Sequence, residues 1–186
     1  VINTAVQVTT PDHVTIVVGS QAERVKAALA HRSVRFAYQS EQLGTGHAVK
    51  ICRDALYDTT GHTVVVYGDG PLLSVGTLRR LIEKQASGNT GATLIISEFE
   101  HPRGYGRVLL DSDGMVVDII EEKAATEEQK RIRLVNPGIY CFRSDLLWKH
   151  IDEIRTDNPA HEYYLTDMPA ILRRAEYRVG TIYVDD

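Results

Sequence analysis

The sequence predicts an α/β fold with a mostly parallel, mixed sheet and a β-hairpin insertion. Apolar, β-branched runs alternate along the chain with segments whose apolar residues recur every three or four positions. The stretch 106–123 has two extended halves joined at Asp113-Gly114, which is typical of a hairpin. The length of 186 residues suits one domain with a sizeable core, so we treat 1–186 as a single, truncated domain.

Four apolar runs in the first half predict strands. The run at 62–70 is the strongest, because its three consecutive valines imply that both faces are covered, as in a parallel sheet. Pro71 then ends the ladder, since proline has no backbone donor. The other three runs are 13–19, 34–38 and 92–99.

Helical spacing fills the intervals between these strands. From Thr45 the apolar residues recur at a period of 3.6, which predicts a helix to about Asp58. Ser74 is expected to cap another helix, whose apolar residues are Val75, Leu78, Leu81 and Ile82. A third helix spans 22–31. No clear element opens the chain before residue 12.

The second half continues after the hairpin with a strand at 134–142 and a helix through Leu146, Leu147 and Ile151. Thr166 is expected to cap the last helix, and a final strand covers 178–184.

Composition excludes several classes of partner. The net charge of -4 argues against nucleic acid, because such proteins usually present a basic face. Two cysteines, Cys52 and Cys141, have neither metal-type spacing nor a disulfide pattern, which favours a reducing, cytoplasmic compartment. No apolar run approaches the roughly 18 residues of a membrane helix.

Polar or glycine-rich stretches follow four of the predicted strands. Ligands of α/β proteins bind beyond the carboxyl ends of the strands, so we expect these stretches to meet at one edge of the sheet. They are Gln39–Gly46, Tyr67–Pro71, Glu121–Lys123 and Asn136–Gly138.

The first stretch has two interpretations. It is not a dinucleotide fingerprint, because Val49 stands where a third glycine belongs. A flat base could lie against Gly44 while Gln39 reads its edge. Alternatively, the stretch is a tight turn in which Thr45 caps the following helix.

Asp69 is the candidate metal ligand. A carboxylate after a buried strand suits Mg²⁺, which accepts one or two carboxylates together with phosphate oxygens. The alternative is an aspartate that opens the turn before Pro71.

The remaining motifs are also ambiguous when each is taken alone. The segment 103–107, RGYGR, is either a lip over a sugar or the entry to the hairpin. Glu121 is either a solvated strand end or an acceptor for sugar hydroxyls, and Asn136 is either a turn residue or a hydroxyl binder. Of Tyr163 and Tyr164, one is expected to pack inward and the other to face a pocket.

In this order and spacing, six segments resemble the uridyltransferase domain of bacterial N-acetylglucosamine-1-phosphate uridyltransferases. The resemblance covers about Asp12–Asp186. The segments are QSEQLGTGHAV, VVVYGDGPLL, RGYGRVLLD, IIEEKAAT, VNPGIY and EYYLTD.

The resemblance implies a Rossmann-like nucleotide-diphosphosugar transferase fold and a cytoplasmic enzyme. It implies the conversion of UTP and N-acetylglucosamine 1-phosphate to UDP-N-acetylglucosamine, a peptidoglycan precursor, and pyrophosphate. The sugar phosphate would attack the α-phosphorus in line, and Asp69 would be the catalytic residue that holds Mg²⁺. The residues implied to bind nucleotide are Gln39, Gly44, Thr45, Tyr67 and Gly68, and those implied to bind the sugar are Gly106, Glu121, Asn136, Tyr164 and Thr166.

The sequence departs from that family at several points. Gly70 stands where valine is usual, and Pro137 stands where threonine is usual. The family's glycine-rich triphosphate loop, its second Mg²⁺ ligand (an asparagine) and its acetyltransferase β-helix have no counterpart in the sequence.

We therefore expect that the N-terminal part of the domain is missing and that this chain alone shows little or no turnover. Homo-oligomers would form through the missing C-terminal domain. The alternatives are a related nucleotidyltransferase for another sugar phosphate or nucleotide, and a non-catalytic nucleotide-sugar binding domain.

Overall fold

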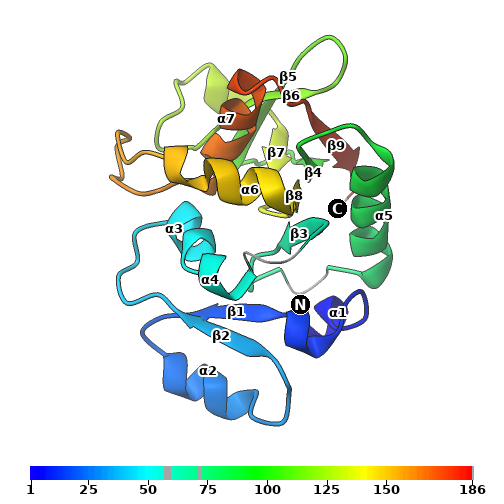
Figure 1. The fold of residues 1–186 in the computed structure, drawn as a ribbon. Helices are drawn as coiled ribbons and strands as arrows, with labels where there is room; N and C mark the ends of the chain where they lie inside the picture. Colours follow the sequence, from blue (N-terminus) through cyan, green and yellow to red (C-terminus); the bar gives the residue numbers. More distant parts are fainter. Residues whose placement is uncertain (57–59, 71–72, 186) are drawn as a thin grey trace.

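A computed structural model describes residues 1–56, 60–70 and 73–185. The N-terminal part contains a two-stranded parallel sheet, formed by β1 (Thr15–Val18) and β2 (Arg35–Tyr38). It also contains α1 (Ile2–Ala5) and α2 (Ala22–Ala28), and it lies at the bottom of the view in Figure 1. A 3₁₀ turn at Pro11–His13 leads into β1.

The rest of the chain is organised around a seven-stranded mixed sheet. Its strands follow the order β3-β8-β4-β7-β5-β6, and β9 pairs with β4. The strands are β3 (His62–Val65), β4 (Ala92–Glu98), β5 (Gly106–Leu110), β6 (Val116–Ile120), β7 (Leu134–Asn136), β8 (Tyr140–Arg143) and β9 (Val179–Tyr183).

Helices cover both faces of this sheet. Alternate residues of β4 point to opposite faces: Ile95 packs in a cluster with Leu81 of α5, whereas Leu94 belongs to the larger core that includes α6 and α7. Burial on both faces explains the continuous apolar run of β4. The helices are α3 (Thr45–Lys50), α4 (Arg53–Leu56), α5 (Val75–Ser87), α6 (Ser144–His150) and α7 (Met168–Arg174), with 3₁₀ turns at Gln129–Arg131, Ile151–Glu153 and Leu165–Asp167.

The predicted class and hairpin are confirmed, but the balance of strand directions is not. Only β1–β2 and β4–β9 are parallel among the recorded pairings, whereas five pairings are antiparallel. In the described part of the chain, β3 is an edge strand antiparallel to β8 and is only partly buried. The prediction of a fully covered parallel strand from the three consecutive valines is therefore wrong.

The predicted strand at 134–142 is interrupted by a bulge. Three residue steps separate Leu94 from Ser97 on β4, whereas five separate their partners Tyr140 and Val135. Gly138 has a φ of 81° within the bulge. Bulges redirect side chains beside functional sites, and this one lies between Asn136 and Tyr140.

Other boundaries differ from the prediction at helix ends. The single helix expected from Thr45 is two short helices, α3 and α4, and its predicted end at Asp58 lies outside the described residues, as does Pro71. The opening segment forms α1, although no element was predicted there. None of the helices that the structure describes is long and apolar enough to cross a bilayer.

Candidate active site

Tyr67, which follows β3, lies where the predicted stretches meet. Burial raises the pKa of Tyr67; a hydrogen bond with the Thr45 side chain opposes this shift, and the charge of Glu121 adds to it. A hydrogen bond with Tyr140 and the charge of Asp69 also act on the phenol. We call Thr45, Tyr67, Glu121, Asn136 and Tyr140 the Tyr67 cluster.

The bulge after β7 supplies one wall of this cluster. A Cβ at Gly138 would overlap the ring of Tyr67, so the ring packs directly on the glycine backbone. Asn136 is 6% exposed; its Oδ1 accepts a hydrogen bond from the Gly138 N–H at 3.1 Å, and its amide donates to the Tyr140 hydroxyl. Asn136 is thus a turn residue, as one interpretation of the sequence expected, and its role as a hydroxyl binder stays a prediction.

The residues predicted to bind a sugar lie together on the hairpin side. The Thr166 hydroxyl donates to Glu121 Oε1 at 2.8 Å. A Cβ at Gly106 would lie 2.8 Å from Ile119 Cγ2 and 3.9 Å from Glu121 Oε1, so glycine lets the β5 backbone lie close against Ile119 and beside Glu121. Gly106 also pairs with Asn136 across β5 and β7.

Tyr164 lies close enough to Glu121 for the charge of the carboxylate to affect its phenol. Burial, then the charges of Glu162 and Glu121, raise the pKa of its phenol. Tyr163 is also partly buried and packs against the main core. Tyr163 is thus the tyrosine that packs inward, and a ligand-facing role for Tyr164 stays a prediction.

The stretch Gln39–Gly46 forms the other side of the site. The Gln39 amide donates to the Gly44 carbonyl at 3.2 Å and lies 3.0 Å from His47 Nδ1. The side-chain nitrogen of Gln39 is therefore engaged within the protein, and its carbonyl oxygen Oε1 is the group that it can present to a ligand.

Gly44 is required by a close approach within the chain. Its φ is 103°, and a Cβ would lie 2.6 Å from the Tyr163 carbonyl oxygen and 2.9 Å from Glu162 Cβ. Hydrogen bonds from Gly46 N to Tyr163 O and from Tyr163 N to Leu43 O, both 2.8 Å, hold the two segments together. A base can use only the face of Gly44 that this segment leaves open.

The predicted cap at Thr166 is wrong, and so is the alternative interpretation of Thr45 as a cap. Gly44 is the N-cap of α3, and Thr45 Oγ1 instead accepts from Leu165 N at 3.0 Å. Asp167 is the N-cap of α7, because Thr166 belongs to the preceding 3₁₀ turn and binds Glu121. Both threonines use their hydroxyls across the site.

Gly68 and Asp69 lie on the exposed loop after Tyr67. The described residues contain no group of three or more acidic, histidine or cysteine side chains that could hold a metal alone. A single exposed carboxylate fits Mg²⁺ of the kind that shares its coordination with waters and substrate phosphates.

Sequence reasoning missed several polar residues around the site. Tyr140 is 0% exposed, and the signal for it was a tyrosine within an apolar strand, whose hydroxyl needs a partner when buried. Asp167 was also missed: burial, then the charges of Asp118 and Asp157, raise its pKa to about 6. No local pattern indicated Asp167, since the neighbouring carboxylates come from other segments.

Comparison with known proteins adds a family to this geometry. The chain matches a family model described as nucleotidyl transferase over residues 1–183. It is 49% identical over 186 residues to the bifunctional protein GlmU of Solibacter usitatus. The aligned region covers 100% of this chain and 40% of that protein.

Two further relatives carry the same name. The protein of Syntrophotalea carbinolica is 44% identical over 171 residues, covering 92% of this chain and 37% of the relative. That of Caldicellulosiruptor saccharolyticus is 41% identical over 173 residues, covering 93% and 37%. The chain therefore spans about two fifths of the length of these relatives.

Proposed function

This chain belongs to the nucleotidyl transferase family, and from this premise we propose its activity. We propose that it carries the active site of a sugar-1-phosphate uridyltransferase. The substrates would be UTP and N-acetylglucosamine 1-phosphate, and the products UDP-N-acetylglucosamine and pyrophosphate. The observation that carries this proposal is the convergence on Tyr67 of Thr45, Glu121 and the Gly138 backbone, which come from three distant stretches.

The base side favours uracil over cytosine. Gln39 presents a carbonyl oxygen because its amide nitrogen is engaged by Gly44 and His47. A carbonyl oxygen accepts the N3–H of uracil, whereas N3 of cytosine is itself an acceptor. The wrong base would leave two acceptors facing each other, which costs about 1–3 kcal/mol.

The sugar side offers acceptors beside a wall without side chains. Glu121 keeps Oε2 available after Oε1 has bound Thr166, and it suits hydroxyl groups. The second amide hydrogen of Asn136 suits an acetamido carbonyl. Gly106 adds no side chain next to Glu121, and a larger residue there would overlap Ile119.

The proposed reaction exchanges one phosphoanhydride bond for another. An oxygen of the sugar phosphate attacks the α-phosphorus of UTP, and the bond from that phosphorus to the oxygen bridging the β-phosphate breaks. Pyrophosphate leaves with the electron pair. Such chemistry depends mainly on positioning and charge neutralisation.

Asp69 would hold the divalent ion of this reaction. When bound, Mg²⁺ supplies charge neutralisation for the phosphates. Gln39, Thr45 and Glu121 of the chain would hold the two substrates in register. UTP is a cytoplasmic metabolite, and the free state of Cys52 and Cys141 fits our proposal that the protein acts in the cytoplasm.

Binding and turnover of the 186-residue chain test the proposal. We expect calorimetry to show UDP-N-acetylglucosamine binding at least about 10-fold tighter than CDP-N-acetylglucosamine, which corresponds to the cost of two facing acceptors. A panel of other UDP-sugars tests the alternative of a different sugar phosphate. Failure to prefer any uridine nucleotide would contradict the proposal.

Asp69→Asn separates an enzyme from a non-catalytic binding domain. Assayed in a full-length enzyme that carries this chain, the variant should lose most of the Mg²⁺-dependent release of pyrophosphate, by about 100-fold or more. UMP, which carries no pyrophosphate to share a metal, should bind the variant and the parent alike. UDP-sugar binding that is indifferent both to Mg²⁺ and to the substitution would instead indicate a binding domain.

A further inference from the structure

Arg107 is a buried charge that the proposed reaction does not use. It lies on β5 next to Gly106, and it is 1% exposed. A guanidinium in such a place must be fully paired, because an unpaired buried charge costs several kcal/mol. Its partners therefore show what this residue holds in place.

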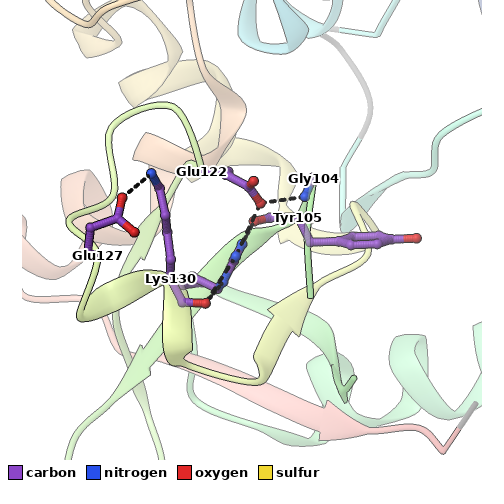
Figure 2. Close-up of polar contacts among 6 residues, drawn as sticks. Gly104, Tyr105, Glu122, Glu127 and Lys130 are labelled. Atoms are coloured by element: carbon purple, nitrogen blue, oxygen red, sulfur yellow. Dashed lines mark hydrogen bonds and ion pairs between the residues drawn. The ribbon is translucent and has the colours of Figure 1, made fainter. Parts of the chain in front are cut away.

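The guanidinium joins three segments that are separate in the sequence. It donates to the Tyr105 carbonyl in the loop that enters β5, to the Lys130 carbonyl at 3.3 and 3.4 Å, and to Glu122 Oε2 at 3.1 Å. Glu122 Oε2 also accepts from Gly104 N. Figure 2 shows this Glu122 carboxylate beside Gly104, with the ring of Tyr105 extending away from it.

The same backbone presents the sugar side of the site. Gly106 and Glu121 are the immediate neighbours of Arg107 and Glu122, and a Cβ at Gly106 would lie 3.9 Å from Glu121 Oε1. Arg107 pairs with Ile120 across β5 and β6, and Glu121 and Glu122 follow directly after β6. An ion pair between Arg107 and Glu122 therefore limits the separation of their neighbours Gly106 and Glu121.

We propose that the Arg107–Glu122 pair is a positioning device for the sugar, which holds the loop 102–105 and Gly106 against Glu121. This inference rests on the proposed function, because it assigns a role to the sugar side of that site. Arg107 touches no substrate in it. The pair acts only through Gly104, Gly106 and Glu121.

The planar fork of arginine is needed for this role. Five donors in a fixed geometry reach two carbonyl oxygens and one carboxylate at once, which the single ammonium of lysine cannot do. Backbone donation from Gly104, followed by the Arg107 guanidinium, lowers the pKa of Glu122. The carboxylate thus remains charged at neutral pH, and the pair persists.

The test compares the binding of UDP and UDP-N-acetylglucosamine by calorimetry, since their difference isolates the sugar. Arg107→Met keeps an apolar stem of similar length and leaves Glu122, which is 27% exposed, to water. We expect UDP-N-acetylglucosamine affinity to fall about 10-fold or more, as for small misplacements in a site, while UDP affinity stays within about 2-fold. Arg107→Lys should restore only part of the loss, because lysine keeps the charge without the fork.

Glu127→Gln is the matched control. Glu127 pairs with Lys130 Nζ at 2.8 Å in the same segment (Figure 2), but this ion pair is exposed and leaves the Lys130 carbonyl on Arg107 intact. Exposed pairs contribute little, so both affinities should match the parent. A loss of sugar affinity in this control equal to that of Arg107→Met would overturn the role of the guanidinium.

Amide hydrogen exchange gives a second readout that needs no ligand. In Arg107→Met, the amides of residues 104–106 should exchange at least about 10-fold faster, while those of β4 stay protected. If the parent binds no uridine nucleotide, the proposed function fails and the role toward the sugar fails with it, whereas accelerated exchange would still show that Arg107 holds the loop 102–105 in place. Unchanged exchange, or equal losses of UDP and UDP-sugar affinity, would overturn the positioning device.

Discussion

At the scale of single residues, Gly44 shows how the site constrains the chain. Its φ of 103° and ψ of 177° belong to a region that only glycine adopts readily. The space where a side chain would point is filled by the backbone of Tyr163. Two independent physical reasons therefore exclude any other residue at this position.

Gly44→Ala is accordingly predicted to destabilise the protein by about 3 kcal/mol or more, which combines backbone strain and overlap. Gly61→Ala is the control, since Gly61 also has a positive φ, of 94°, but has nothing within 4 Å of an added Cβ. It should cost only about 1 kcal/mol. Urea unfolding of both variants measures the difference, and equal costs would show that overlap at Gly44 contributes nothing.

Asp167 makes the free energy of unfolding depend on pH. Burial, then the charges of Asp118 and Asp157, raise its pKa from 3.8 to about 6. The folded state therefore binds this proton more tightly than the unfolded state does. Between about pH 4 and 6 the contribution of Asp167 to the free energy of unfolding falls as pH rises, and above pH 6 the charged group destabilises the fold.

Asp167→Asn should remove this cost. We expect the variant to exceed the parent by about 1 kcal/mol in the free energy of unfolding at pH 7.5, after allowing for solvent screening of a partly exposed group. The advantage should vanish near pH 4. Asp54→Asn, which neutralises an exposed carboxylate of α4, controls for net charge. A pH-independent advantage would contradict the assignment to this carboxyl.

At the scale of elements, α5 is defined by its cap and its apolar face. Ser74 Oγ accepts from Thr77 N at 3.0 Å, which satisfies one of the free N–H groups at the start of the helix. Leu78 and Leu81 are 1% and 0% exposed, one turn apart, against the sheet. Sequence reasoning found both features because each is encoded within a few neighbouring residues.

Ser74→Ala should therefore cost about 1 kcal/mol of unfolding free energy. Ser87→Ala is the control at the opposite end of α5, where the hydroxyl makes only a local contact with the Lys84 carbonyl at 3.3 Å. It should stay within about 0.5 kcal/mol of the parent. Thermal or urea unfolding decides between them, and an equal effect of the two serines would argue against a capping role.

At the scale of the whole molecule, the two sheets differ in how well they are supported. β4 pairs with β7, β8 and β9 and is buried along most of its length. The sheet of β1 and β2 has only two strands, and most of its residues are partly or fully exposed. Two-stranded sheets are marginal alone, because they bury little apolar surface.

Hydrogen exchange should report this difference. The amides of Leu94 and Ile96 in β4 are predicted to exchange about 100-fold or more slowly than those of Val17 and Ala37 in β1 and β2, since the latter open without global unfolding. Mass spectrometry of peptides from both sheets provides the measurement. Equal protection would mean that the two sheets unfold as one cooperative unit.

The sequence alone determined the α/β class, the hairpin, the cap at Ser74 and the stretches that carry the site. Each of these depends on residues close together in the chain, where periodicity and turn chemistry act. The antiparallel edge position of β3, the bulge before Tyr140, the hydroxyl contacts of Thr45 and Thr166 and the burial of Arg107 were decided by tertiary structure. Their physical cause is pairing between segments tens of residues apart, which determines the strand neighbours and the partner of each buried polar group.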